Sequence, residues 1–170
     1  PYGGVWRAQN FDYNKLYYNP RITYTPWPGD DSTGTLYGDV NPKAALLDPY
    51  VPISGSVDLT TPTAFQTDYC AGALATVDVT NYLIPRYYSW TDTDADGVVD
   101  AEDAHTLVEI EPTTLAYQGS VLRRDCAAAP KCTYAEEIQN FANWFSYYRK
   151  REYVAKAAYG RVIAGASNSR

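Results

Sequence analysis

The sequence contains no methionine, one histidine and three cysteines among its 170 residues. One histidine and the lack of a C-x-x-C pair argue against a zinc site. No apolar run of about 18 residues occurs, so we expect no membrane span in this chain. No basic patch alternates with stacking aromatic residues, which argues against nucleic acid as a partner. Because position 1 is Pro1, we expect a processed or excised piece, and a signal for export could have been removed.

The negative charge of the chain is concentrated in one window. Net charge is −6, and residues 91–111 hold eight of the twenty acidic residues but no lysine or arginine. The rest of the chain carries fourteen basic against twelve acidic residues. With 45% hydrophobic residues, the sequence predicts one folded domain, with or without a long insertion, rather than a disordered chain.

The acidic window contains the pattern D-x-D-x-D-G-x-x-D-x-x-D over residues 92–103. This is the spacing of an EF-hand-type calcium loop, because a hard cation needs six to eight oxygen ligands and every second side chain can point inward. A glycine at the sixth position, Gly97, allows a sharp turn at positive φ. We therefore predict calcium as the cofactor, with these metal ligands: Asp92, Asp94, Asp96, the backbone carbonyl of Val98, Asp100 (directly or through water) and Asp103.

Two features of this loop leave alternatives open. The twelfth position is Asp103, where an EF-hand usually has a glutamate of longer reach, and the segment resembles the dockerin type of extracellular calcium loop equally well. The loop also occurs once, whereas EF-hands usually come in pairs. The alternative without calcium is a solvated acidic turn.

The cysteines suggest an oxidising environment. Cys126 and Cys132 bracket a five-residue segment that a disulfide could close, which would brace the start of the following helix. We favour this disulfide over free thiols. Cys70 is then left over, either free or paired with a part of the protein outside this chain.

Local patterns predict an α+β fold with short strands and irregular Pro/Tyr-rich segments. Prolines and aromatic residues in 1–30 favour extended or turn structure and exclude helix. β-Formers between Ile53 and Tyr88 predict two or three short strands. Ala104–Ile110 fits a short helix or strand, and Leu115–Leu122 is ambiguous. His105 follows the acidic turn and is expected to be solvated.

The clearest element is a long C-terminal amphipathic helix over 133–165. Thr133 and Glu136 form a capping box. Apolar residues at steps of three and four predict a buried stripe on one helix of about 30 residues. Glu137 begins it and basic residues fill its later half, as the helix dipole prefers, with Gly160 or Gly165 ending it. The stripe comprises Ile138, Phe141, Phe145, Tyr148, Ala155, Tyr159 and Val162. We divide the chain into an aromatic-rich extended and β region, 1–132, and this helix, and we expect both to belong to the same domain.

Two stretches carry a resemblance to a known family. Residues 140–151 resemble the NFANW-x-x-YYR-x-R helix of PilY-type proteins, which are adhesins at the tip of type IV pili. Residues 17–27 are similar to the YYNP-x-x-x-Y-x-PW stretch that precedes it in that family. The resemblance implies a piece of an N-terminal von Willebrand factor A-like region, with its helix packed on a sheet. The family's D-x-S-x-S adhesion motif does not occur here, so no residue is assigned to it.

Three functions follow as hypotheses. The first is a non-enzymatic, calcium-binding piece of a pilus-associated surface protein in adhesion, pilus assembly or surface sensing. Its partners would be pilus or filament subunits and the remainder of its parent protein, and it would be extracellular. The second is a subunit or accessory protein of an extracellular filament that uses its aromatic N-terminal arm for contact. The third is an extracellular carbohydrate-binding module. The chain shows no nucleophile elbow, phosphate loop or separate acid pair, so we expect no enzyme.

Overall fold

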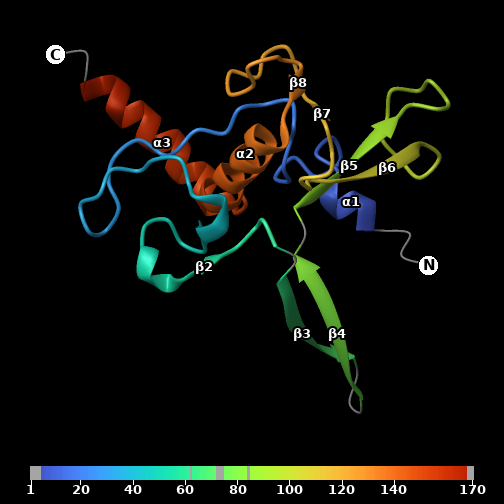
Figure 1. The fold of residues 1–170 in the computed structure, drawn as a ribbon, viewed down its shortest axis with the longest axis horizontal. Coiled ribbons are helices and arrows are strands. Elements are labelled where there is room, and N and C mark those ends of the chain that lie inside the picture. The colour runs from blue at the N-terminus through green and yellow to red at the C-terminus, as the bar shows by residue number, and fades with distance from the viewer. Residues whose placement is uncertain (1–4, 62, 72–74, 84, 168–170) are drawn as a thin grey trace.

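The computed structural model describes residues 5–61, 63–71, 75–83 and 85–167, and it has a mixed α+β fold (Figure 1). The helices are α1 (Val5–Gln9), α2 (Tyr134–Tyr147) and α3 (Arg151–Ser167), with short 3-10 turns at Pro42–Ala44 and Pro52–Ser54. The strands are β1 (Ala45–Leu46), β2 (Ser56–Val57), β3 (Thr63–Ala71), β4 (Ala75–Leu83), β5 (Arg86–Thr91), β6 (Ala104–Glu109), β7 (Tyr117–Gln118) and β8 (Lys131–Cys132). Among the described residues, none of the helices combines the length and the apolar composition that a membrane-spanning helix needs.

The strands pair only two at a time in the described part of the chain. The antiparallel pairs are β1–β2, β3–β4, β5–β6 and β7–β8. The β3–β4 hairpin extends away from the helices, whereas β5–β6 lies beside α1 (Figure 1). The segment 104–110, open between helix and strand from its sequence, is a strand over most of its length. Cys70 lies in β3, and its side chain is outside the described part.

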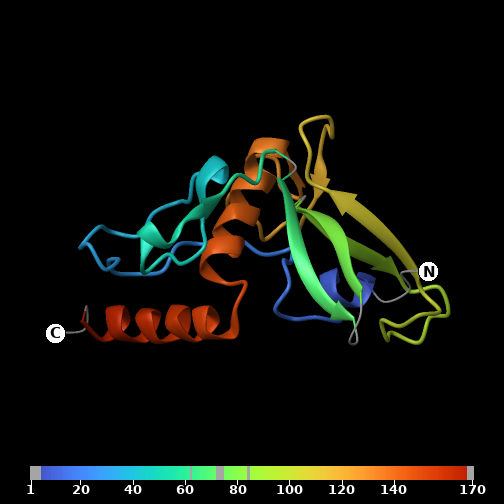
Figure 2. The ribbon, with the colours of Figure 1, turned by 90° about the horizontal axis from the view of Figure 1, so that it is seen from below.

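The single long helix predicted over 133–165 is wrong, because the chain forms two helices. Figure 2 shows α3 running in a clearly different direction from α2, with the break at residues 148–150. The indole N–H of Trp27 donates to the carbonyl of Tyr147 at 2.8 Å, and the guanidinium of Arg149 donates to the carbonyl of Phe145. These side chains satisfy carbonyls that a continuing helix would pair with its own N–H groups. A distant tryptophan therefore helps to end α2.

The break also changes which residues of the second half are buried. The predicted stripe residues Tyr159 and Val162 are 72% and 69% exposed. Tyr153 and Ala157 are buried instead, each with 2% of its surface exposed. A turn between two helices resets the direction of the buried face, so a stripe extrapolated through the turn fails.

The prediction that residues 1–30 contain no helix is wrong near the N-terminus. Residues 5–9 form α1, although helix was excluded from 1–30. This helix lies before Pro20, the first internal proline, and it packs on β5. From Pro20 to Pro28 the chain has no helix, as the proline spacing predicts.

Two asparagines of α2 bond the irregular segment that lies across the helix. Asn140 accepts from the N–H of Tyr24 at 2.7 Å and donates to the carbonyl of Ile22 at 2.9 Å. Asn143 accepts from the N–H of Val40 at 3.0 Å and donates to the carbonyl of Tyr24 at 2.9 Å. Buried backbone groups need partners, and here side-chain amides supply what a neighbouring strand would supply elsewhere. The two stretches that resemble the PilY family therefore pack on each other.

The core around these bonds is largely aromatic. Edge-to-face and tilted ring contacts join the 11–37 segment to α2, for example between Tyr18 and Phe141 with ring centroids 4.9 Å apart. Most of the many tyrosines and tryptophans of the first 30 residues thus serve packing rather than an exposed contact arm. The buried aromatic residues in the described part of the chain are Trp6, Phe11, Tyr18, Tyr24, Trp27, Tyr87, Tyr117, Phe141, Trp144, Phe145, Tyr147 and Tyr153.

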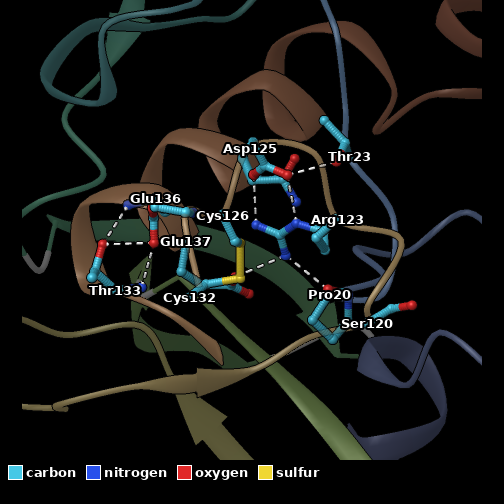
Figure 3. The surroundings of a disulfide bond; sticks show 12 residues. Pro20, Thr23, Ser120, Arg123, Asp125, Cys126, Cys132, Thr133, Glu136 and Glu137 are labelled. Atoms are coloured by element: carbon cyan, nitrogen blue, oxygen red, sulfur yellow. Dashed lines mark hydrogen bonds and ion pairs between the residues drawn. A yellow bond between two sulfur atoms is a disulfide. The ribbon is translucent and has the colours of Figure 1, made fainter. Parts of the chain in front are cut away.

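A buried ion pair fastens the loop before α2 to the core (Figure 3). The guanidinium of Arg123 lies 3.0 Å from Glu137, binds Asp125 through two nitrogens and donates to the carbonyl of Pro20 at 2.7 Å. The hydroxyl of Tyr18 donates to Glu137 at 2.7 Å. Burial raises the pKa of Glu137, while Arg123 and Tyr18 oppose that shift. From the sequence, Glu137 was expected only to interact favourably with the helix dipole. In the structure it is fully buried at the centre of this network.

The predicted disulfide and capping box are both present beside this network. Cys126 and Cys132 are joined, with their Cα atoms 5.1 Å apart. Glu136 accepts from the N–H of Thr133 at 2.7 Å and from the N–H of Ala127 at 2.8 Å. Its carboxylate therefore ties the disulfide-closed segment to the first turn of α2, as expected for a brace at the start of the helix (Figure 3).

Acid should weaken this brace. The N–H groups of Ala127 and Thr133 lower the pKa of Glu136, so its contribution to stability is present above its unfolded pKa of about 4.3 and is lost as pH falls through the folded value. We expect the melting temperature to fall between pH 5 and pH 3, and less steeply in Glu136→Gln, because glutamine does not titrate and keeps one of the two acceptor oxygens. Glu111→Gln, at an exposed site, should retain the full slope. Equal slopes in both variants would contradict the prediction.

Candidate metal centre

The acidic loop connects two paired strands. Thr91 and Ala104 form the last pair of the β5–β6 ladder, so the twelve residues 92–103 lie between the two strands. An EF-hand places the same kind of loop between two helices. The flanks here are strands, and an EF-hand helix pair is not present. Of the EF-hand pattern, only the twelve-residue acidic loop is therefore left to consider as a metal site.

Three of the predicted ligands come together. One carboxylate oxygen from each of Asp92, Asp94 and Asp96 lies within 4.8 Å of the others, and all three side chains are exposed. Bends over residues 93–97 bring these side chains together. The donor set is one that hard divalent cations prefer, because it consists of carboxylate oxygens on a solvent-accessible loop.

The backbone of the loop turns at the predicted place. Gly97 has φ +76°, the left-handed region that glycine enters without steric cost, and Ala95 has φ +62°. The N–H of Gly97 donates to Asp92 at 3.0 Å, and the N–H of Val98 donates to Asp96 at 2.7 Å. These bonds fold the loop back over its first aspartates and hold their carboxylates near one another.

The electrostatics of the loop favour a cation. The N–H of Asp96 lowers the pKa of Asp94, but desolvation and the negative charges of Asp96, Asp100 and Asp103 outweigh that bond and raise it. Repulsion from these like charges thus adds to desolvation in disfavouring the charged form of Asp94. A bound divalent cation would remove this repulsion, so the residues present fit such an ion.

The other predicted ligands are placed differently. Asp103 is 7% exposed and accepts from the N–H of Thr93 at 3.0 Å and of Asp100 at 3.2 Å, so it joins the two ends of the loop. Asp100 accepts from the N–H of Glu102 at 2.8 Å. Neither carboxylate belongs to the close group of three. The side chain of Val98 is 56% exposed, and its N–H rather than its carbonyl is engaged with the loop aspartates.

Contacts with residues near the N-terminus support the hairpin that carries the loop, and the sequence did not indicate them. His105 was expected to be solvated, but it is half-buried, stacks on Trp6 with ring centroids 3.6 Å apart and contacts the carbonyl of Asp100 through Nε2. Trp90 donates its indole N–H to Asp12 at 2.8 Å. Trp6, Asp12 and His105 are far apart in sequence, and no short pattern links them. The β5–β6 hairpin is therefore held in place by contacts with α1 and with the residues that follow α1.

No protein-family model, curated protein or solved structure matches this chain. Function must therefore be argued from the site and its chemistry.

Proposed function

We propose that this chain is a calcium-binding piece of a type IV pilus-associated cell-surface protein that acts without catalysis in adhesion, pilus assembly or surface sensing. The observation that carries the proposal is the group of three carboxylates, Asp92, Asp94 and Asp96, on a hairpin loop with calcium-loop spacing. The resemblance of residues 17–27 and 140–151 to the PilY family supplies the pilus context.

Calcium is preferred to magnesium for this loop on chemical grounds. Magnesium demands near-ideal octahedral geometry and gives up its water reluctantly, whereas calcium accepts many carboxylate and carbonyl oxygens in a flexible loop. Asp92, Asp94 and Asp96 would hold the ion, and Asp103 would keep the ends of the loop together. The ion would neutralise the repulsion among the aspartates and thereby stabilise the tip of the β5–β6 hairpin.

Two further observations support the proposal, and the first of them supports an extracellular location. The disulfide between Cys126 and Cys132 is of the kind that persists in oxidising environments. The two stretches of family resemblance also pack on each other through Asn140 and Asn143, which supports assigning both to one unit of the proposed parent protein. The partners we propose are pilus or filament subunits and the remainder of the parent protein.

A calorimetric calcium titration of the purified chain, with thermal melts in calcium and in chelator, tests the metal assignment. We expect one site and a melting temperature that rises with calcium, because an ion that binds only the folded state stabilises it by RT ln(1 + [L]/Kd). Magnesium at the same concentration should produce a much smaller rise. The absence of heat and of any shift with calcium would reduce the loop to a solvated acidic turn and overturn the proposal.

A further inference from the structure

A cleft of about 350 Å³ lies between the segment from Trp27 to Tyr50 and helix α3. This segment and α3 lie at the end of the molecule away from the β5–β6 hairpin (Figure 1). The walls of the cleft combine aromatic rings with one carboxylate and one ammonium group. The lining residues are Trp27, Pro28, Asp30, Tyr37, Tyr50 and Lys156.

The floor of the cleft is fixed by packing. Trp27 is 5% exposed, holds its indole N–H on the carbonyl of Tyr147 at 2.8 Å and meets Tyr37 edge-to-face with ring centroids 5.5 Å apart. A Cβ atom added at Gly160 would lie 3.0 Å from the ring of Pro28, so the glycine lets α3 approach this segment closely. Tyr50, at 49% exposure, forms the open wall.

The cleft already contains a cation, which belongs to the protein. The Nζ atom of Lys156 lies 5.6 Å from the ring centroid of Trp27, 5.4 Å from that of Tyr50 and 5.8 Å from that of Tyr153. Cation–π attraction extends to about 6 Å, so the ammonium is attracted by three rings but held loosely by each. Within the described part of the chain, Lys156 forms no ion pair.

Negative charges lie near Tyr37 on the Trp27–Tyr50 side of the cleft, whereas Arg149 and Lys150 also lie over the ring of Tyr153. The carboxylate of Asp30 lines the cleft, and no ion pair or hydrogen bond to it occurs among the described residues. Burial, and then the charges of neighbours that include Asp30, Asp31 and Asp48, raise the pKa of Tyr37 to about 12. Aromatic faces beside a carboxylate without an ion-pair partner, here that of Asp30, are an environment that accepts positive charge.

We propose that this cleft binds a small organic cation, a substituted ammonium ion such as the choline group, in the place that Lys156 now occupies. A quaternary ammonium ion makes no hydrogen bonds and gains more from aromatic faces than a strongly hydrated lysine ammonium does. Lys156 is exposed, so its side chain can move into water at little cost. The inference is independent of the calcium loop.

Titration of the full chain with tetramethylammonium and with choline tests this site, followed by the NMR signal of the Trp27 indole N–H. Lys156→Met should raise the affinity for both ions about tenfold, equal to about 1.4 kcal/mol, because it removes the competing charge and opens the ring faces. Lys156→Gln serves the same purpose if the methionine variant is unstable. Adding Tyr50→Ala or Asp30→Asn to the Lys156 variant should reverse the gain.

Matched controls separate the cleft from general charge effects. Lys131→Met removes one positive charge at an exposed site on β8 and should leave the affinity unchanged. Choline in solution and phosphatidylcholine vesicles distinguish a free ligand from a lipid headgroup, and binding of either supports the site. Titrations in calcium and in chelator should agree, so failure of the calcium proposal would not affect this one. No gain in the Lys156 variants, or an equal gain in Lys131→Met, would overturn the inference.

Discussion

Arg123→Met is expected to destabilise the folded chain by about 3–5 kcal/mol, because it leaves the carboxylate of Glu137 buried without its charge partner. The loss should grow as pH rises above the unfolded glutamate pKa of about 4.3, since the unpaired buried carboxyl would have a still higher folded pKa and would ionise at increasing cost. Denaturant unfolding at pH 5 and at pH 8 measures both effects.

The neighbouring arginine provides the control for this experiment. Arg124 is exposed, so Arg124→Met should change the free energy of unfolding by no more than about 0.5 kcal/mol. The double variant Arg123→Met with Glu137→Leu should recover part of the stability, because replacing both charges leaves no unpaired group. If Arg123→Met lowered the free energy of unfolding by less than about 1 kcal/mol, Glu137 would not depend on Arg123 as its charge partner.

Asp92→Asn and Asp96→Asn are each expected to abolish most of the stabilisation by calcium. In the unchanged chain, calcium at 100 times its Kd would add about 2.7 kcal/mol to the free energy of unfolding. Asparagine keeps the shape of the side chain but removes the charge and one strong ligand, so each variant should need a far higher calcium concentration for the same rise. Calorimetry and calcium-dependent melts give the affinity and the stability separately.

The control for the loop variants is Glu102→Gln, which removes an exposed acidic charge from the same loop without touching the close group of three. It should retain nearly the full calcium response. In chelator, the two asparagine variants should be no less stable than the unchanged chain, because they relieve repulsion within the loop. If Glu102→Gln lost as much calcium affinity as Asp96→Asn, bulk negative charge rather than the three-carboxylate group would explain binding.

Several features of this chain depend on contacts between near neighbours in sequence, and these are the features that the sequence predicts. The capping box of Thr133 and Glu136 spans three residues, and the disulfide between Cys126 and Cys132 spans six. The turn at Gly97 and the meeting of the first three loop aspartates also depend on local backbone geometry. Residue type and spacing determine such features wherever the segment is placed.

Other features arise from residues that meet only in the folded chain. Trp27 and Tyr147 are 120 positions apart, and their hydrogen bond marks the point where the predicted single helix ends. Apolar spacing carries through such a turn unchanged, so the stripe over 133–165 gave no sign of it. Glu137, likewise, had the sequence context of a helix-dipole residue until the fold placed Arg123 beside it.

The sequence by itself determined the α+β class, the acidic loop at 92–103, the disulfide and the start of α2, because short-range spacing encodes each of them. Only the tertiary structure decided that the loop joins two strands, that Asp103 joins the loop's ends and that His105 packs on Trp6. It also placed Lys156 among aromatic rings from another segment. The physical reason is that burial and charge partners are properties of neighbours in space, and these neighbours come from distant parts of the chain.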